Sequence, residues 1–164
     1  MPKNIDTIGR KFGANLTKVG QNIITQSFNL HPFTRTQADL IGYFRQKNLS
    51  VSLFDRAYKI IPLHEWQEIV KYVNITEEKW IEDYFDCDNK SYYYASLMSL
   101  LFKLNSCGVA RVPGHLFNLL LSGSPQELKL YVYDPRGLEI KEYNPSGTII
   151  DGFDYTKISW AYYF

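Results

Sequence analysis

Apolar residues in the first thirty positions recur at steps of three and four. The residues with this spacing are Ile5, Ile8, Phe12, Leu16, Val19 and Ile23. Such spacing places them on one face of a helix, although three glycines in the segment each weaken it by about 1 kcal/mol relative to alanine. We therefore expect residues 1–30 to form an amphipathic arm. The arm either packs on its own domain or binds a partner helix, a membrane surface or a second copy of the chain.

Helical spacing returns in three segments before residue 105. Thr36 is a typical N-cap and predicts a helix over about 37–48, and Pro62 opens a second helix. A longer helix begins at Cys87 or just after it, and Gly108 is a natural stop for that helix.

Strand patterns dominate the last third of the chain. Alternating or continuous apolar runs predict strands at 109–112, 116–121, 128–132, 138–140, 148–150 and 158–164, and a short extended piece at 51–54. An order of helices followed by an antiparallel meander is typical of an α+β domain. We expect residues 31–164 to form this domain, with the long helix packed on an antiparallel sheet.

Composition narrows the class of protein but does not name a function. The chain has 164 residues, is 45% hydrophobic and has a formal net charge of +1. Its hydrophobic content is sufficient for a folded core. A nucleic-acid ligand is not indicated, because the net charge is small and the arginines are not clustered. No signal peptide and no apolar run of membrane-spanning length is visible. Two cysteines do not make a disulfide framework, so we expect reduced thiols in the cytoplasm or a host-cell interior.

One cysteine and one histidine have positions suited to catalysis. Cys87 lies at the start of the long helix, and a helix N-terminus favours the reactive thiolate. Of the three histidines, His31 precedes a proline and His64 lies at a polar helix start, whereas His115 heads an apolar strand. Asp134 closes the next strand. Adjacent antiparallel strands can bring these last two side chains together, as a histidine base requires.

Three segments of the sequence resemble motifs of a known family. They are 86–89 (DCDN), 114–118 (GHLFN) and 133–136 (YDPR). Their order and spacing resemble the papain-like or transglutaminase-like cysteine peptidases that include the protease domain of a mushroom agglutinin and many phage and bacterial proteins. The resemblance covers about residues 50–142.

The resemblance implies a role for each matching residue. Cys87 would be the nucleophile, His115 the general base and acid, and Asp134 the acid that orients the histidine. Asn118 would support the histidine strand. From position alone, Gln67 and Asn74 are candidates for the second oxyanion donor, beside the backbone N–H of the cysteine.

The same resemblance suggests a calcium site next to the cysteine. In the agglutinin, the acids that flank the cysteine help to bind calcium. The matching positions here are Asp86 and Asp88, with Asn89 as a third candidate. Oxygen ligands of this kind suit a hard cation. The acyl-transfer chemistry itself requires no cofactor.

Two functions are consistent with these observations. The first is a cysteine-dependent amide hydrolase, a peptidase or amidase, that acts on a protein or peptide substrate through a Cys-His-Asp triad. The second is an inactive module with the same papain-like fold that binds partners through its N-terminal arm. This alternative includes a virus-encoded binding or structural protein. Lys90, Leu116 and Arg136 depart from the family pattern and favour the second function.

Overall fold

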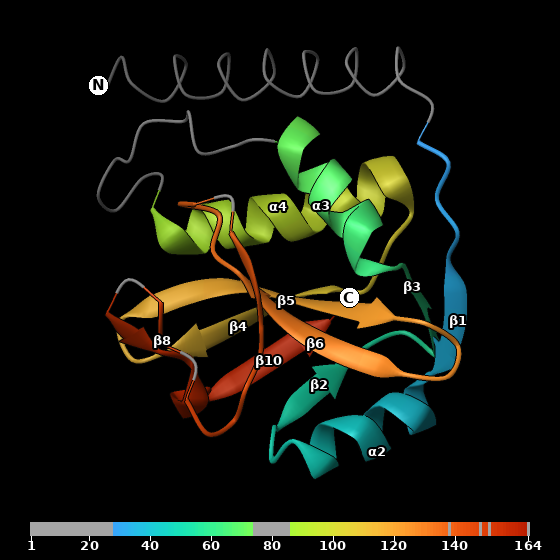
Figure 1. Cartoon of the computed structure of the whole chain (residues 1–164). Helices are drawn as coiled ribbons and strands as arrows, with labels where there is room; N and C mark the ends of the chain where they lie inside the picture. Colours follow the sequence, from blue (N-terminus) through green and yellow to red (C-terminus); the bar gives the residue numbers. More distant parts are fainter. Residues whose placement is uncertain (1–27, 74–85, 138, 148, 151, 164) are drawn as a thin grey trace, which may run out of the picture. The chain divides into compact units, whose positions relative to one another are not determined.

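The structure is a computed structural model of the whole chain (Figure 1). It describes residues 28–73, 86–137, 139–147, 149–150 and 152–163. The chain divides into two compact units, 1–30 and 31–164, and the described helices and strands all belong to the second. All but the last three residues of the predicted N-terminal arm lie outside the described ranges, so its amphipathic helix and its binding role stay predictions.

The three helices predicted within residues 31–164 are present. They are α2 (Gln37–Gln46), α3 (Leu63–Tyr72) and α4 (Cys87–Phe102). Thr36 is the N-cap of α2 and forms a capping box with Asp39, because each side chain accepts a hydrogen bond from the other residue's backbone N–H. In the described part of the chain, no helix combines the length and the apolar character needed to cross a bilayer.

The end of α4 differs from the prediction. The helix is capped by Lys103, which adopts the left-handed conformation with φ of 57°. Gly108 is not the stop but the second residue of strand β4, which begins at Cys107. A Cβ atom at Gly108 would lie 2.8 Å from the Tyr163 ring. The glycine therefore serves close packing rather than helix termination.

A six-stranded sheet forms the centre of the unit, in the order β2-β10-β4-β5-β6-β7. Its strands are β2 (Val51–Leu53), β4 (Cys107–Val112), β5 (His115–Gly123), β6 (Leu128–Tyr133), β7 (Ile140–Glu142) and β10 (Trp160–Tyr163). The predicted antiparallel meander is confirmed for β4 to β7.

The last strand does not continue the meander. β10 instead returns to lie between β2 and β4, antiparallel to β4 and parallel to β2. Ala161 pairs with Val51 on one side and with Ala110 on the other. The expected antiparallel sheet is therefore wrong, and the sheet is mixed. The fold class remains α+β.

Short strands also lie outside this sheet. β1 (Phe33–Thr36) pairs antiparallel with β3 (Ala57–Ile60), so the first half of the unit contains a strand pair that we did not expect. Near the C-terminus, β8 (Ile149–Ile150) falls within the predicted strand at 148–150. It pairs with β9 (Phe153–Asp154), which was not predicted and leads into a 3₁₀ turn, η1 (Tyr155–Lys157). The missed segments are too short to show a clear period.

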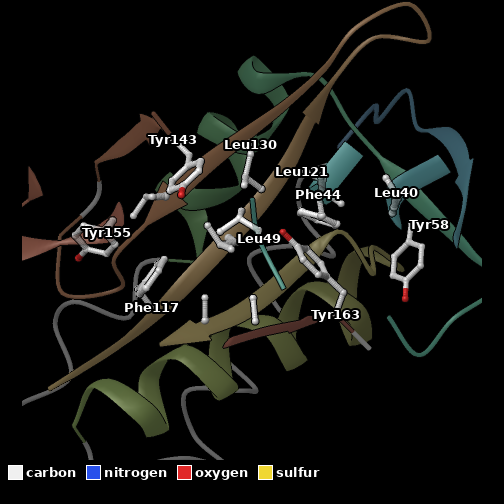
Figure 2. Packing of buried hydrophobic residues seen from close by; sticks show 14 of the residues in the cluster. Leu40, Phe44, Leu49, Tyr58, Phe117, Leu121, Leu130, Tyr143, Tyr155 and Tyr163 are labelled. Atoms are coloured by element: carbon white, nitrogen blue, oxygen red, sulfur yellow. The ribbon is translucent and has the colours of Figure 1, made fainter. Parts of the chain in front are cut away.

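Helices cover both faces of the sheet (Figure 1). The main core lies on the α2 face, where Leu40 and Phe44 of the helix pack in one cluster with Phe117, Leu119 and Leu121 of β5 (Figure 2). The intervening residues of β5 point to the opposite face. α4 lies there, and the start of α4 and the start of β5 lie towards the same end of the sheet.

Candidate active site

The predicted histidine–aspartate pair is formed at one end of the inner strands β5 and β6. Pro113 and Gly114, with a φ of 78° at the glycine, turn the chain so that β5 begins at His115. Asp134 follows the last residue of the neighbouring strand β6. The His115 Nε2 atom lies 2.7 Å from Asp134 Oδ2, and the two residues are only 2% and 4% exposed. The strand spacing therefore predicted this contact correctly.

Asp134 accepts hydrogen bonds from other groups besides His115. The backbone N–H of Arg136 donates to Oδ1 at 3.0 Å, which is a typical Asx turn. The Arg136 guanidinium donates to Oδ2 through Nη2 at 2.5 Å and through Nε at 3.0 Å. Tyr155 donates its hydroxyl to Oδ2 at 3.2 Å. Asp134 thus holds four different groups in place, one of them a guanidinium.

These contacts fix the charge of Asp134. Burial raises the pKa of its carboxyl, but the hydrogen bonds from His115 and Arg136 lower it by more, and the result is a pKa well below the usual range. The carboxylate is therefore ionised at any pH at which the histidine can act as a base.

Aromatic rings enclose the imidazole. Phe153 of β9 stacks on His115 with ring centroids 4.4 Å apart and an interplanar angle of 30°. Tyr155 meets the same ring edge-on at 6.3 Å, and Phe117 lies at 6.3 Å. The sequence analysis missed Phe153 and Tyr155. Nothing in their local pattern signals a role, because β9 and η1 join the site only through the tertiary fold.

Cys87 is the first residue of α4 and is half-buried. Asp86 is the N-cap residue, but its side chain makes no capping hydrogen bond. Ser91 donates its hydroxyl to the Cys87 carbonyl at 2.7 Å. Cys107 differs sharply, because it is 2% exposed and burial raises the pKa of its thiol.

Asn118 connects the helix to the histidine strand. Its side chain is fully buried, and Nδ2 donates to the Ser91 carbonyl at 2.9 Å and to the Gly108 carbonyl at 3.1 Å. The amide of Asn118 thus joins strand β5 to helix α4 and strand β4. Its partner Ser91 lies one helical turn after Cys87, and Asn118 itself lies three residues after His115. The supporting role that the family resemblance implies for Asn118 stays a prediction.

Cys87 and His115 are not hydrogen-bonded to each other in the part of the chain that the structure describes. Along β5, the histidine lies on the same face as Phe117, whereas Asn118 on the opposite face meets α4. The imidazole already uses Nε2 for Asp134, so Nδ1 is the nitrogen that remains for a thiol. Catalytic hydrogen bonds are often longer before substrate binds.

The residues next to Cys87 carry two interacting carboxyls. A hydrogen bond with Asp88, burial and the charge of Asp88 all raise the pKa of Asp86. The Asn89 N–H donates to Asp88 Oδ1 at 2.7 Å. Within the described ranges, no group of three or more His, Cys, Asp or Glu side chains is placed to hold a metal ion. The calcium site at Asp86, Asp88 and Asn89 stays a prediction.

The remaining candidates differ in their exposure. Gln67 is exposed on α3, and its role as an oxyanion donor stays a prediction. Asn74 lies outside the described residues. Among the departures from the family pattern, Lys90 is 3% exposed and Leu116 is half-buried.

The other two histidines belong to a different part of the unit. His64 is exposed on α3, and His31 contacts Glu65 of the same helix through Nδ1 at 2.9 Å. His115 is therefore the histidine that the structure combines with a buried carboxylate of the sheet.

Comparison with known proteins shows a likeness of fold alone. No family model matches the chain, and no curated protein matches it. A solved structure, the PSL1a-E64 complex, is similar with a TM-score of 0.55 and 12% sequence identity. The similarity covers 79% of this chain and 51% of that chain, so this chain spans about half the length of the protein it resembles.

Proposed function

We propose that the protein is a cysteine-dependent amide hydrolase of papain-like fold, with Cys87, His115 and Asp134 as its catalytic residues. The observation that carries the proposal is the buried contact between His115 Nε2 and Asp134 Oδ2, at the end of the sheet where the helix bearing Cys87 begins. The fold of the PSL1a-E64 complex supports it, since E64 is an inhibitor of cysteine proteases.

The proposed reaction is acyl transfer from an amide of a protein or peptide. The Cys87 sulfur attacks the carbonyl carbon as its proton passes to His115 Nδ1. The negative charge that develops on the carbonyl oxygen accepts a hydrogen bond from the Cys87 backbone N–H at the helix N-terminus. His115 then returns the proton to the amine nitrogen as the C–N bond breaks, which leaves the acyl group on the Cys87 sulfur as a thioester. Water, deprotonated by the same nitrogen, releases the acid from the thioester and regenerates the thiol.

Asp134 orients the base throughout this cycle. By accepting a hydrogen bond at 2.7 Å, it keeps the neutral imidazole protonated at Nε2, so that Nδ1 carries the lone pair. Its depressed pKa keeps the acceptor ionised during turnover. The stacked ring of Phe153 restrains rotation of the imidazole.

Labelling with E-64 tests the proposal directly. The full-length protein is incubated with E-64 at pH 6, and the modified cysteine is located by peptide mass spectrometry. We expect a thioether on Cys87, no label in Cys87→Ala and label retained in Cys107→Ala, because Cys107 is buried. His115→Ala should label far more slowly than the wild type. Label that is absent from the wild type, or equal in His115→Ala, would refute the proposal.

One set of contacts favours a second function, a binding module that has lost activity. The negative charge of Asp134 is already paired with the guanidinium of Arg136. In addition, within the described residues the Cys87 sulfur and His115 share no hydrogen bond. Such a module keeps the His115–Asp134 pair as a structural contact only. It predicts that His115→Ala changes stability while E-64 modifies Cys87 in neither protein, which separates it from the hydrolase.

A further inference from the structure

Arg136 forms a closed arrangement with the proposed base and its carboxylate. The guanidinium donates to both oxygens of Asp134, and its central carbon lies 5.1 Å from the centre of the Phe153 ring. Phe153 also stacks on the ring of His115. The phenyl ring of Phe153 therefore contacts the guanidinium of Arg136 and the imidazole of His115. Both of these groups also hydrogen-bond to Asp134.

We propose that Arg136 is a positioning residue that holds Asp134 and Phe153 against His115 and lowers the proton affinity of the imidazole. The catalytic meaning of this inference rests on the proposed function, but the inference itself concerns only the protonation and the tautomer of His115. In this arrangement, the group that orients His115 is the Arg136–Asp134 ion pair rather than Asp134 alone.

The sum of the charges near the ring determines the proton affinity of the imidazole. A lone carboxylate at 2.7 Å would favour the imidazolium over the neutral imidazole. Arg136 offsets that charge through its own hydrogen bonds to Asp134, and it also repels a positive charge on the ring. Its side chain is only 28% exposed, so water screens it incompletely. Both effects act in the same direction and lower the proton affinity of His115.

Other ionisable groups on the elements packed around His115 act in the background. On α4 and its N-cap they are Asp86, Cys87, Asp88 and Lys90; on β4, Arg111; on β6, Lys129, Tyr131 and Tyr133; and near η1, Asp154, Tyr155 and Lys157. Phe117 and Phe153, which face the ring, are apolar. A comparison between variants at Arg136 leaves all of these groups in place. A change in the titration of His115 can then be assigned to the guanidinium.

The test is an NMR titration of His115 in the full-length protein. Nitrogen-15 labelled protein reports both the pKa and the tautomer of each ring, and His31→Gln and His64→Gln variants assign the signals. We expect the neutral wild-type His115 ring to carry its proton at Nε2, the nitrogen that contacts Asp134. Arg136→Gln should raise the pKa of His115 by about one unit, a tenfold gain in proton affinity.

Two variants serve as controls. Arg136→Lys retains a positive charge and should leave the titration near the wild-type value. Arg111→Gln removes the same charge from an exposed position on β4, the strand that pairs with the start of β5, and should shift the titration by much less than Arg136→Gln. If Arg136→Gln does not fold, Arg136→Met takes its place, and an unchanged pKa of His115 in that variant overturns the proposal.

The two proposals fail separately. An unchanged or lowered pKa of His115 in Arg136→Gln, or a shift matched by Arg111→Gln, overturns the role of Arg136 whatever the protein does with E-64. Absence of E-64 labelling refutes the hydrolase and leaves the titration result unaffected.

Discussion

The two halves of the candidate site are built in opposite ways. We call the first the strand corner, which consists of His115, Asp134, Arg136, Phe153 and Tyr155. We call the second the helix mouth, which consists of Asp86, Cys87 and Asp88. In the strand corner, each polar side chain has a partner and the ring is enclosed by aromatics. The helix mouth is half-buried to exposed, and its N-cap side chain makes no capping bond.

The carboxyls of the two regions respond to their surroundings in opposite directions. The pKa of Asp134 is lowered because donors, one of them a cation, surround it. The pKa of Asp86 is raised because its nearest partner is another carboxyl. The difference teaches that the nature of the partner, more than burial, sets the charge of a carboxyl here, since Asp134 is the more buried of the two.

The largest expected effect is on the strand corner. Asp134→Ala should lower the free energy of unfolding by about 3 kcal/mol, because it leaves His115 and Arg136 without their acceptor in a largely buried place. Urea denaturation followed by tryptophan fluorescence measures this change. A loss below about 1 kcal/mol would show that the strand corner is less tightly coupled than its contacts indicate.

The next effect concerns the link between the two regions. Asn118→Ala should cost about 2 kcal/mol, because the carbonyls of Ser91 and Gly108 lose a buried donor. Hydrogen exchange should also accelerate in the first two turns of α4, while β5 keeps most of its protection. Asn89→Ala, at an exposed position on the same helix, is the matched control and should change exchange little. Equal effects of the two variants would argue against Asn118 as the connection.

A fall in pH should change the contributions of Asp134 and Asp86 to the free energy of unfolding in opposite directions. The folded-state pKa of Asp134 is depressed, so its contribution to stability is complete above the unfolded value of about 4 and is lost as the pH falls below it. Asp86 has a raised pKa, so its protonated form favours folding and that contribution is lost as the pH rises. The stability gap between wild type and Asp134→Asn should therefore shrink from pH 6 to pH 3, as measured by urea denaturation at each pH. A constant gap would contradict it.

The smallest effect is expected at the helix mouth. Asp88→Asn should change the free energy of unfolding by no more than about 0.5 kcal/mol, since the residue is exposed. It should, however, bring the pKa of Asp86 closer to its usual range, because Asp88 is the main cause of the rise. Carboxyl carbon-13 NMR titration measures this pKa. A pKa of Asp86 that does not fall would assign the rise to burial instead.

Sequence reasoning succeeded where the signal is local. The start of α4 at Cys87 follows from helical spacing, and the contact between His115 and Asp134 follows from adjacent strands. It failed where residues meet through tertiary structure. Phe153 reaches the imidazole from a two-residue strand that carries no periodicity. Arg136 was noted only as a departure from the family pattern, because sequence does not show which oxygen a guanidinium will meet.

Gly108 shows the same limit for the fold. A glycine soon after a helical run is a common helix stop, so the sequence predicts that the long helix ends before Gly108. The position is instead determined by the Tyr163 ring, which belongs to a strand at the other end of the sequence. No local pattern distinguishes a glycine that ends a helix from one that makes room for a distant side chain.

The placement of β10 between β2 and β4 also has a consequence for the order of folding. Ala161 must find Val51, which lies far away along the chain, before the sheet is continuous. Pairings of high contact order close large loops at an entropic cost and form slowly. The hairpins from β4 to β7 join neighbouring segments and can form early. Arrival of β10 is thus expected to be a late kinetic step, and until then β4 has an unpaired edge on which another chain could add a strand.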